Sequence, residues 1–166
     1  MATRAPVTIE EYLRTGEYER SELVDGQIVE RSMPKDAHSK AQVRLVLLLA
    51  RVSERTPLHI RTELTVQTAP SRYRIIDVSA YTGKEPAEET PASPPYIAVE
   101  IVSPDDRYTR LIEKLQEYRA WGVAHVWLVD PWLPKTYVYD ERGLNDVPAF
   151  RVPELELEIN LTDIVG

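Results

Sequence analysis

Two acidic residues lie in the middle of apolar stretches of this sequence. Glu100 interrupts an apolar run over residues 96–102, and Asp77 lies inside a second run over residues 72–81. Runs of this length and composition predict strands that are buried on both faces. A carboxylate in such a strand is costly unless it is protonated, paired or bound to a metal. The two strands leave two interpretations open. Both acids can bind one divalent metal in the sheet, or one acid can form a buried ion pair with an arginine while the other lies at the end of its strand.

A lysine on the next predicted element can join the two carboxylates. Residues 103–106 predict the end of the second strand and the start of a helix that runs to about residue 121. On that helix Lys114 lies about 60° from the inner apolar stripe. Its aliphatic stem can therefore follow the edge of the core while its ammonium reaches a cleft.

Two carboxylates beside a lysine suit the hydrolysis of a phosphodiester. That reaction needs neutralised phosphoryl oxygens and an activated water, and Mg²⁺ supplies both while taking only one or two protein carboxylates. The lysine can orient or deprotonate the water, or hold the phosphate as a point charge. If the two acids bind a metal, the expected ion is Mg²⁺ or Mn²⁺, with Asp77 and Glu100 as its ligands and Lys114 as a third catalytic residue.

Two further residues, Glu22 and His38, are candidates for the same site. Glu22 opens a hairpin that the Asp25-Gly26 pair predicts, and its alternative role is that of a solvated strand end. His38 lies in the first turn of the longest predicted helix, where its spacing from Leu45 turns it inward. Its alternative role is that of a packing residue in the core.

The predicted elements surround one mixed sheet. A capping box at Thr8 and Glu11 begins a short helix that runs to about Arg14. A strand over residues 59–68 should pair antiparallel with the strand of Asp77, because only a short turn separates them. The other expected elements are a helix over residues 34–55, a surface loop over 83–95, paired strands over 124–129 and 135–139, and a half-exposed edge strand over 155–159. Together they predict an α/β (α+β) fold with a mixed central sheet flanked by helices.

Length and composition limit the class of protein. The 166 residues predict one domain over residues 1–166. The absence of cysteine excludes a disulfide scaffold and a cysteine nucleophile, and it fits a reducing cytoplasm. No apolar run reaches the length of a membrane span. The net charge of −7 argues against a general polyanion binder, but residues 1–80 carry 12 Lys+Arg and 11 Asp+Glu, a net charge of +1. A DNA partner therefore stays open.

The longest predicted helix also suggests an assembly. Its apolar residues spread over more of its circumference than one sheet can cover, so another surface should cover the rest. A second subunit is one such surface. Trp121, Trp127 and Trp132 also lie in one short region of the sequence. We therefore expect a homodimer.

The order and spacing of these residues resemble the Uma-two family, a large bacterial group of predicted endonucleases in the PD-(D/E)xK superfamily. The resemblance extends from Glu22 to about Tyr139. The matching pieces, as they stand here, are Glu22-Leu-Val-Asp-Gly26 with Glu30, His38, Arg74-Ile-Ile-Asp77-Val, Val99-Glu100-Ile-Val-Ser-Pro104, Lys114 with Tyr118, Gly122-Val123, and Val126-Trp-Leu-Val-Asp-Pro131.

The resemblance implies a restriction-endonuclease-like core that acts on DNA, with Asp77 and Glu100 as metal ligands and Glu22 as an additional acidic member. One departure is that the lysine expected two residues after Glu100 is replaced by Val102. The resemblance suggests that Lys114 supplies that charge from the following helix. Two other functions remain open: a catalytically idle member of the fold that binds a partner or assembles, and a hydrolase of small nucleotides.

Overall fold

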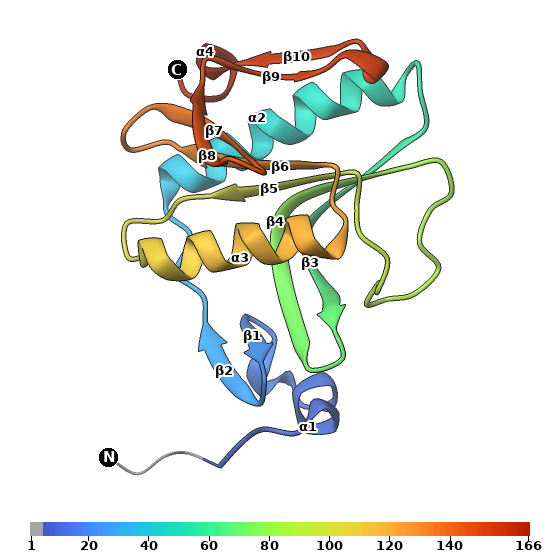
Figure 1. Cartoon of the computed structure of the whole chain (residues 1–166), viewed down its shortest axis with the longest axis vertical. Helices are drawn as coiled ribbons and strands as arrows, with labels where there is room; N and C mark the ends of the chain where they lie inside the picture. The colour runs from blue at the N-terminus through green and yellow to red at the C-terminus, as the bar shows by residue number, and fades with distance from the viewer. Residues whose placement is uncertain (1–4) are drawn as a thin grey trace.

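The structure, a computed structural model that describes residues 5–166, consists of one large sheet with a long helix on each face and a small hairpin beside one of these helices (Figure 1). The eight-stranded sheet has the order β2-β1-β4-β5-β6-β7-β8, and β3 pairs with the other edge of β4. Only β5 and β6 pair in parallel, so the sheet is mixed, as the sequence predicts. Residues 1–4 of the expected single domain lie outside the described part.

The strands are β1 (Ser21–Val24), β2 (Gln27–Glu30), β3 (Leu58–Ala69), β4 (Arg72–Thr82), β5 (Ile97–Ile101), β6 (His125–Asp130), β7 (Lys135–Asp140), β8 (Gly143–Val147), β9 (Ala149–Val152) and β10 (Leu157–Asn160). The α-helices are α1 (Ile9–Arg14), α2 (Asp36–Ser53), α3 (Tyr108–Trp121) and α4 (Leu161–Ile164), and two short 3₁₀ segments are η1 (Gly16–Tyr18) and η2 (Pro153–Leu155). The predicted order of elements is confirmed, whereas β8 and β9 were not predicted.

Local sequence signals explain where several elements begin and end. The predicted capping box is present, because the Glu11 amide donates to Thr8 Oγ1 at 3.1 Å and the Glu11 carboxylate accepts from the Thr8 amide at 2.9 Å. The predicted Asp-Gly turn joins β1 to β2, with φ of 50° at Asp25 and 82° at Gly26. Two consecutive positive φ angles are the requirement of a tight hairpin turn whose twist matches its strands.

The buried strand β5 divides its side chains between two cores. Ile97, Val99 and Ile101 pack in the core beneath α2, whereas Ala98 packs in the core beneath α3. This alternation is the one that the sequence predicts for a strand buried on both faces. Glu100 therefore points towards α3.

The strand β4 is irregular at Asp77. Ile76 packs in the core beneath α3, yet Val78 packs in the core beneath α2. Residues two apart on a regular strand share a face, so the strand changes its facing between them. The residue of β3 opposite Asp77 is Glu63, which adopts a left-handed conformation with φ of 52°. Irregular pairing of this kind is common beside functional sites, where it turns a side chain in a new direction.

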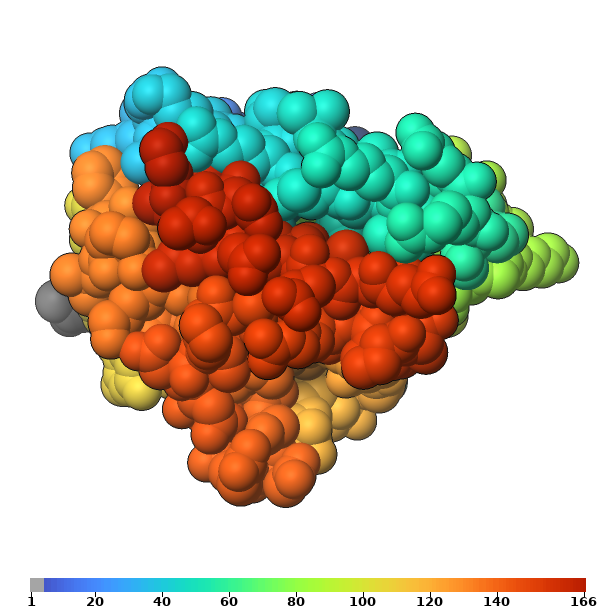
Figure 2. Space-filling model, turned by 90° about the horizontal axis from the view of Figure 1, so that it is seen from above, coloured from blue at the N-terminus to red at the C-terminus, as the bar shows by residue number. Residues whose placement is uncertain are grey.

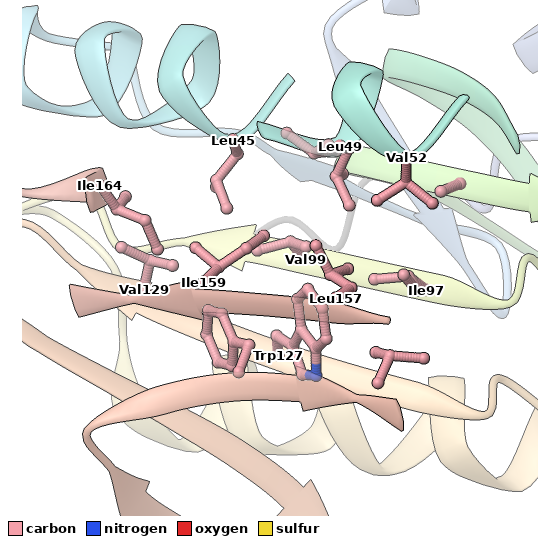
Figure 3. Packing of buried hydrophobic residues seen from close by; sticks show 14 of the residues in the cluster. Leu45, Leu49, Val52, Ile97, Val99, Trp127, Val129, Leu157, Ile159 and Ile164 are labelled. Carbon is pink, nitrogen blue, oxygen red and sulfur yellow. The ribbon is translucent and has the colours of Figure 1, made fainter. Parts of the chain in front are cut away.

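The C-terminal end of the chain packs beside α2, on the same face of the large sheet. β9 and β10 form a separate hairpin, and residues 148–166 lie alongside α2 in Figure 2. Leu157 and Ile159 of β10 pack in the same core as Leu45 and Leu49 of α2 (Figure 3). The hairpin thus covers one flank of α2, which is part of the apolar surface that the sequence analysis assigned to a second subunit.

Aromatic stacking ties this hairpin to the large sheet. Trp127 of β6 and Phe150 of β9 stack with their ring centroids 4.3 Å apart and their planes almost parallel. Val43 and Leu47 of α2 remain 57% and 60% exposed, so the homodimer stays a prediction that rests on a smaller apolar surface. Within residues 5–166, no helix is long and apolar enough to cross a bilayer.

Candidate active site

The site lies along one edge of β4, between the part that pairs with β1 and the part that pairs with β5. On this edge β1 pairs with the first two residues of β4, whereas β5 pairs with residues 78–80. Residues 74–77 therefore have no strand beside them there, and their backbone groups need other partners. Side chains provide them: the Ile75 amide donates to Glu22 Oε1 at 2.9 Å, and the Ile75 carbonyl accepts from Lys114 Nζ at 2.8 Å. The gap thus gathers charged side chains from three elements into the middle of the sheet.

Asp77 is held at the end of this gap that is closer to β5. Its Oδ2 accepts from the Ile101 amide at 2.7 Å and lies 3.4 Å from His38 Nε2. Its Oδ1 forms an ion pair with Arg31, and its backbone carbonyl accepts from Gln42 Nε2 at 2.9 Å. The carboxylate is buried, and these contacts fix its orientation.

Lys114 connects two acids of the site. Its Nζ lies 2.6 Å from Glu22 Oε1 and 3.1 Å from Glu100 Oε2. Tyr118 OH donates to the other oxygen of Glu100 at 2.7 Å. Because Lys114 and Tyr118 are four residues apart on α3, they lie on the same side of the helix. The helix therefore presents one charged donor and one neutral donor to the buried acids.

A second group of ion pairs fixes Glu22. Arg74 Nη1 lies 3.1 Å from Glu22 Oε2, and Arg74 Nη2 lies 2.6 Å from Glu117. Thr68 Oγ1 donates to Glu117 at 2.6 Å. Since only two residue pairs join β1 to β4, these side chains add to the attachment of the β1–β2 hairpin and set the position of Glu22.

His38 uses one of its two ring nitrogens. Its Nε2 faces the Asp77 carboxylate, which can only accept, so this nitrogen carries the hydrogen. The other nitrogen, Nδ1, is buried and has no hydrogen-bond partner among residues 5–166. Such a group costs about 1–3 kcal/mol. His38 therefore helps to orient Asp77, and its buried, unpaired Nδ1 lowers the stability of the fold.

All five site residues that the sequence singled out line one cavity of about 240 Å³: Glu22, His38, Asp77, Glu100 and Lys114. Two arginines of the same cavity, Arg31 and Arg74, were not predicted. A signal existed for Arg74, which is a charged residue inside an apolar strand and three residues before Asp77. Arg31 gave no such signal, because it follows a predicted strand as many surface residues do.

The two candidate metal ligands have pKa values that depart in opposite directions. Burial raises the pKa of Glu100 to about 8, with a contribution from the charge of Asp77, and Lys114 opposes this rise only in part. Burial also acts to raise the pKa of Asp77, but contacts with His38 and Arg31 outweigh it and lower that pKa to about 2. At neutral pH Asp77 is thus ionised, whereas Glu100, with a pKa of about 8, is ionised only in part.

The donor set fits a divalent cation held by two carboxylates. The side chains that these ion pairs connect are six acids and four cations, namely Glu22, Asp25, Glu63, Asp77, Glu100 and Glu117 against Arg31, Arg72, Arg74 and Lys114. With every acid ionised, the cluster has two more negative than positive charges, and a divalent cation balances them. In the part of the chain that the structure describes, no three His, Asp or Glu side chains are arranged to hold a metal. Mg²⁺ suits such a site, because it keeps several water ligands.

Replacing Glu100 with glutamine should make the stability of the metal-free protein depend less on pH. Because the folded-state pKa of Glu100 is raised, its contribution to stability is complete below about pH 4 and is lost as the pH rises towards 8. Glutamine keeps the shape of the side chain and cannot ionise. In urea titrations with a chelator, we expect the wild type to lose stability relative to Glu100→Gln between pH 5 and 8, by at most about 1.4 kcal/mol per pH unit. Parallel pH profiles of the two proteins would contradict this prediction.

The buried acids and Lys114 meet at the gap along β4 between β1 and β5. This arrangement in a mixed sheet is expected of a nuclease-like α/β protein. The sequence profile of the family described as "Uma2: Putative restriction endonuclease" matches residues 9–163. The chain therefore belongs to the Uma2 family.

A solved structure supports the same fold. The crystal structure of a protein described as a "putative nuclease" from Anabaena variabilis superposes with a TM-score of 0.81, and the match covers 96% of this chain and 97% of that one. The sequences are 24% identical, so this likeness concerns the fold. The comparison with curated proteins gives no match.

Proposed function

We propose that this protein is a metal-dependent endonuclease that hydrolyses phosphodiester bonds in DNA. One observation carries the proposal: Asp77, Glu100 and Lys114 come from three elements and line a single cavity whose charged cluster has excess negative charge. The family description and the nuclease-like fold support the class of reaction.

Asp77 and Glu100 are the proposed ligands of Mg²⁺ or Mn²⁺. The bound ion would neutralise charge on the phosphoryl oxygens and lower the pKa of a water molecule. The Ile101 amide holds the Asp77 carboxylate in place, and Tyr118 OH holds that of Glu100. In the reaction, the oxygen of a water that has lost a proton to the solvent forms a bond to phosphorus while the bond from phosphorus to the leaving sugar oxygen breaks, and that oxygen takes up a proton from the solvent.

Lys114 is proposed to act as a charged donor. Burial opposes its charge, but the negative charges of Glu100 and Glu22 outweigh burial and raise its pKa. An ammonium that stays protonated does not remove a proton from water. It orients the water or holds a phosphoryl oxygen, which are two of the roles that the sequence left open. Glu22 and His38 are then positioning residues, for Lys114 and Asp77 respectively.

Three arginines at the mouth of the cavity can contact an anionic substrate. Arg20, Arg107 and Arg110 line the cavity, are exposed, and make no side-chain hydrogen bond or ion pair within residues 5–166. Three acids share the mouth and are also without such partners there, namely Glu30, Asp105 and Glu113. The mouth itself is thus close to neutral. We propose that DNA binding depends on the divalent cation as well as on these arginines.

Cleavage assays on several substrates test the proposed function. Single-stranded DNA, duplex DNA, RNA and small nucleotides are each incubated with the protein in Mg²⁺, in Mn²⁺ and in a chelator. We expect DNA to be cut in the metal-containing reactions only. Cleavage of small nucleotides alone would replace the proposal with the second alternative. Binding of metal without cleavage of any substrate would favour the catalytically idle alternative, which the internal pairing of Glu22, Asp77 and Glu100 also supports.

A further inference from the structure

Arg31 is paired with the carboxylate that the proposed metal requires. It lies in the connection between β2 and α2, and its side chain is 17% exposed. Its guanidinium forms ion pairs with Asp77 on the buried side and with Glu63 on the exposed side. The sequence did not single out this residue, and it has no role in the proposed reaction.

A guanidinium and a divalent cation compete for Asp77. The carboxylate has two oxygens, of which Oδ2 already accepts from the Ile101 amide and Oδ1 pairs with Arg31. A metal at Asp77 therefore meets a positive charge on the same buried carboxylate, where charges are screened far less than in water. Metal binding and the Arg31–Asp77 pair exclude or weaken each other.

We propose that Arg31 is the internal counter-ion of Asp77, that a divalent cation displaces it, and that the displaced guanidinium binds a phosphate group of the substrate. This inference rests on the proposed function of the site. It assigns Arg31 a role in regulating metal binding and in contacting the substrate.

The surroundings of Arg31 favour movement of its side chain alone. Ser32 Oγ donates to Asp106 at 2.8 Å, and Asp106 also accepts from the Ser103 amide at 2.7 Å, so the backbone next to Arg31 is attached to the segment after β5. Glu63 is on the exposed side and can keep one end of the guanidinium when Asp77 is released. Arg31 lines the cavity, so rotation of its side chain leaves it beside a bound substrate.

Arginine is suited to both partners in this exchange. Its planar fork of donors pairs with a carboxylate or with a phosphate through two parallel hydrogen bonds. Metal removes Arg31 from Asp77, and a phosphate provides a new anion for it. Each ligand therefore favours the same position of the side chain, and the affinities for metal and phosphate should be positively coupled.

Titration calorimetry of the full chain with Mn²⁺ tests the first half of the inference. We expect Arg31→Gln to bind Mn²⁺ about tenfold more tightly than the wild type, because a competing charge is removed from Asp77. Arg119→Gln is the matched control, since it removes an arginine that pairs with the exposed Glu141 and does not line the cavity, and it should change the affinity less than about threefold. Arg31→Met is a second charge-removing variant, and circular dichroism establishes which of the two is folded.

The second half is tested with deoxyadenosine monophosphate, which has a phosphate group and no phosphodiester bond to cut. Saturation with this nucleotide should tighten Mn²⁺ binding by the wild type about tenfold. In Arg31→Gln the nucleotide should leave the Mn²⁺ affinity almost unchanged.

The outcomes separate this inference from the proposed function. If the wild type and Arg31→Gln bind Mn²⁺ equally, the counter-ion role is wrong while the metal site stands. If nucleotide tightens Mn²⁺ binding equally in both proteins, the phosphate contact of Arg31 is wrong. If neither protein binds Mn²⁺, the inference and the proposed function fail together.

Discussion

Replacing Lys114 with methionine should abolish detectable cleavage and destabilise the metal-free protein by about 3–5 kcal/mol. Sequence alone suggests that methionine is harmless to the fold, because it keeps the unbranched stem at the edge of the core. The structure changes that expectation. The Lys114 ammonium is buried and pairs with Glu22 and Glu100. Its loss leaves two buried acids without their shared cation and the Ile75 carbonyl without its donor.

Two further variants separate charge from packing in this prediction. Lys135→Met removes a lysine that pairs with Asp146 on the surface, and it should change stability by less than about 1 kcal/mol. Glu100→Gln combined with Lys114→Met should be more stable than Lys114→Met alone, because it removes the acid that has lost its ion-pair partner, whereas Glu22 keeps Arg74. The measurements are urea midpoints in a chelator. Equal stability of Lys114→Met and the wild type would show that Lys114 does not compensate these acids.

The position of the catalytic charge can be tested by moving it. Val102 packs on the α3 side of β5, which is the side towards which Glu100 points. Val102→Lys in the Lys114→Met protein should therefore restore part of the cleavage. The recovery should be incomplete, since a longer side chain replaces a half-buried valine and strains the packing around it. Full activity of Lys114→Met without this second change would show that Lys114 is not the catalytic lysine, and His38 would be tested next.

The sequence could predict which acids gather in this cavity, because they break a strong pattern. An ionisable residue inside a doubly buried strand is visible without a structure, and alternation along the strand gives its direction. Glu100 is such a case, since it points to α3 as alternation requires. Residues placed by a turn or by the first turn of a helix, such as Glu22 and His38, could be predicted because those local signals are strong.

The rest of the site could not be predicted, because it depends on how strands share an edge. The gap beside residues 74–77 exists only because β1 and β5 pair with different parts of β4. The change of facing at Asp77 also violates the alternation on which sequence reasoning relies. Arg31 reaches Asp77 from a connection whose path follows from tertiary packing. These three features decide which partner each acid has, and therefore how the cluster responds to loss of a charge.

Replacing Asp77 should have the largest effect on metal binding, and the choice of replacement matters. Asp77→Asn keeps an oxygen that can accept from the Ile101 amide, so it removes the charge and preserves most of the local structure. Asp77→Ala also removes that acceptor and leaves a buried amide unpaired, which should cost about 1–3 kcal/mol more. Both variants should lose Mn²⁺ binding in calorimetry. Cleavage should fall roughly a thousandfold, since the metal contributes several kcal/mol of transition-state stabilisation.

The pH dependence of stability provides an independent check on Asp77. Its pKa is lowered to about 2 in the folded state, so its contribution to stability is complete above about pH 4 and is lost as the pH falls towards 2. Asp77→Asn lacks this contribution at every pH. In urea titrations, the wild type should therefore exceed Asp77→Asn in stability at pH 5, and the difference should shrink between pH 4 and 2. A constant difference over that range would mean that the charge of Asp77 gains nothing from Arg31 and His38. The arrangement of partners around the proposed metal ligand would then need another explanation.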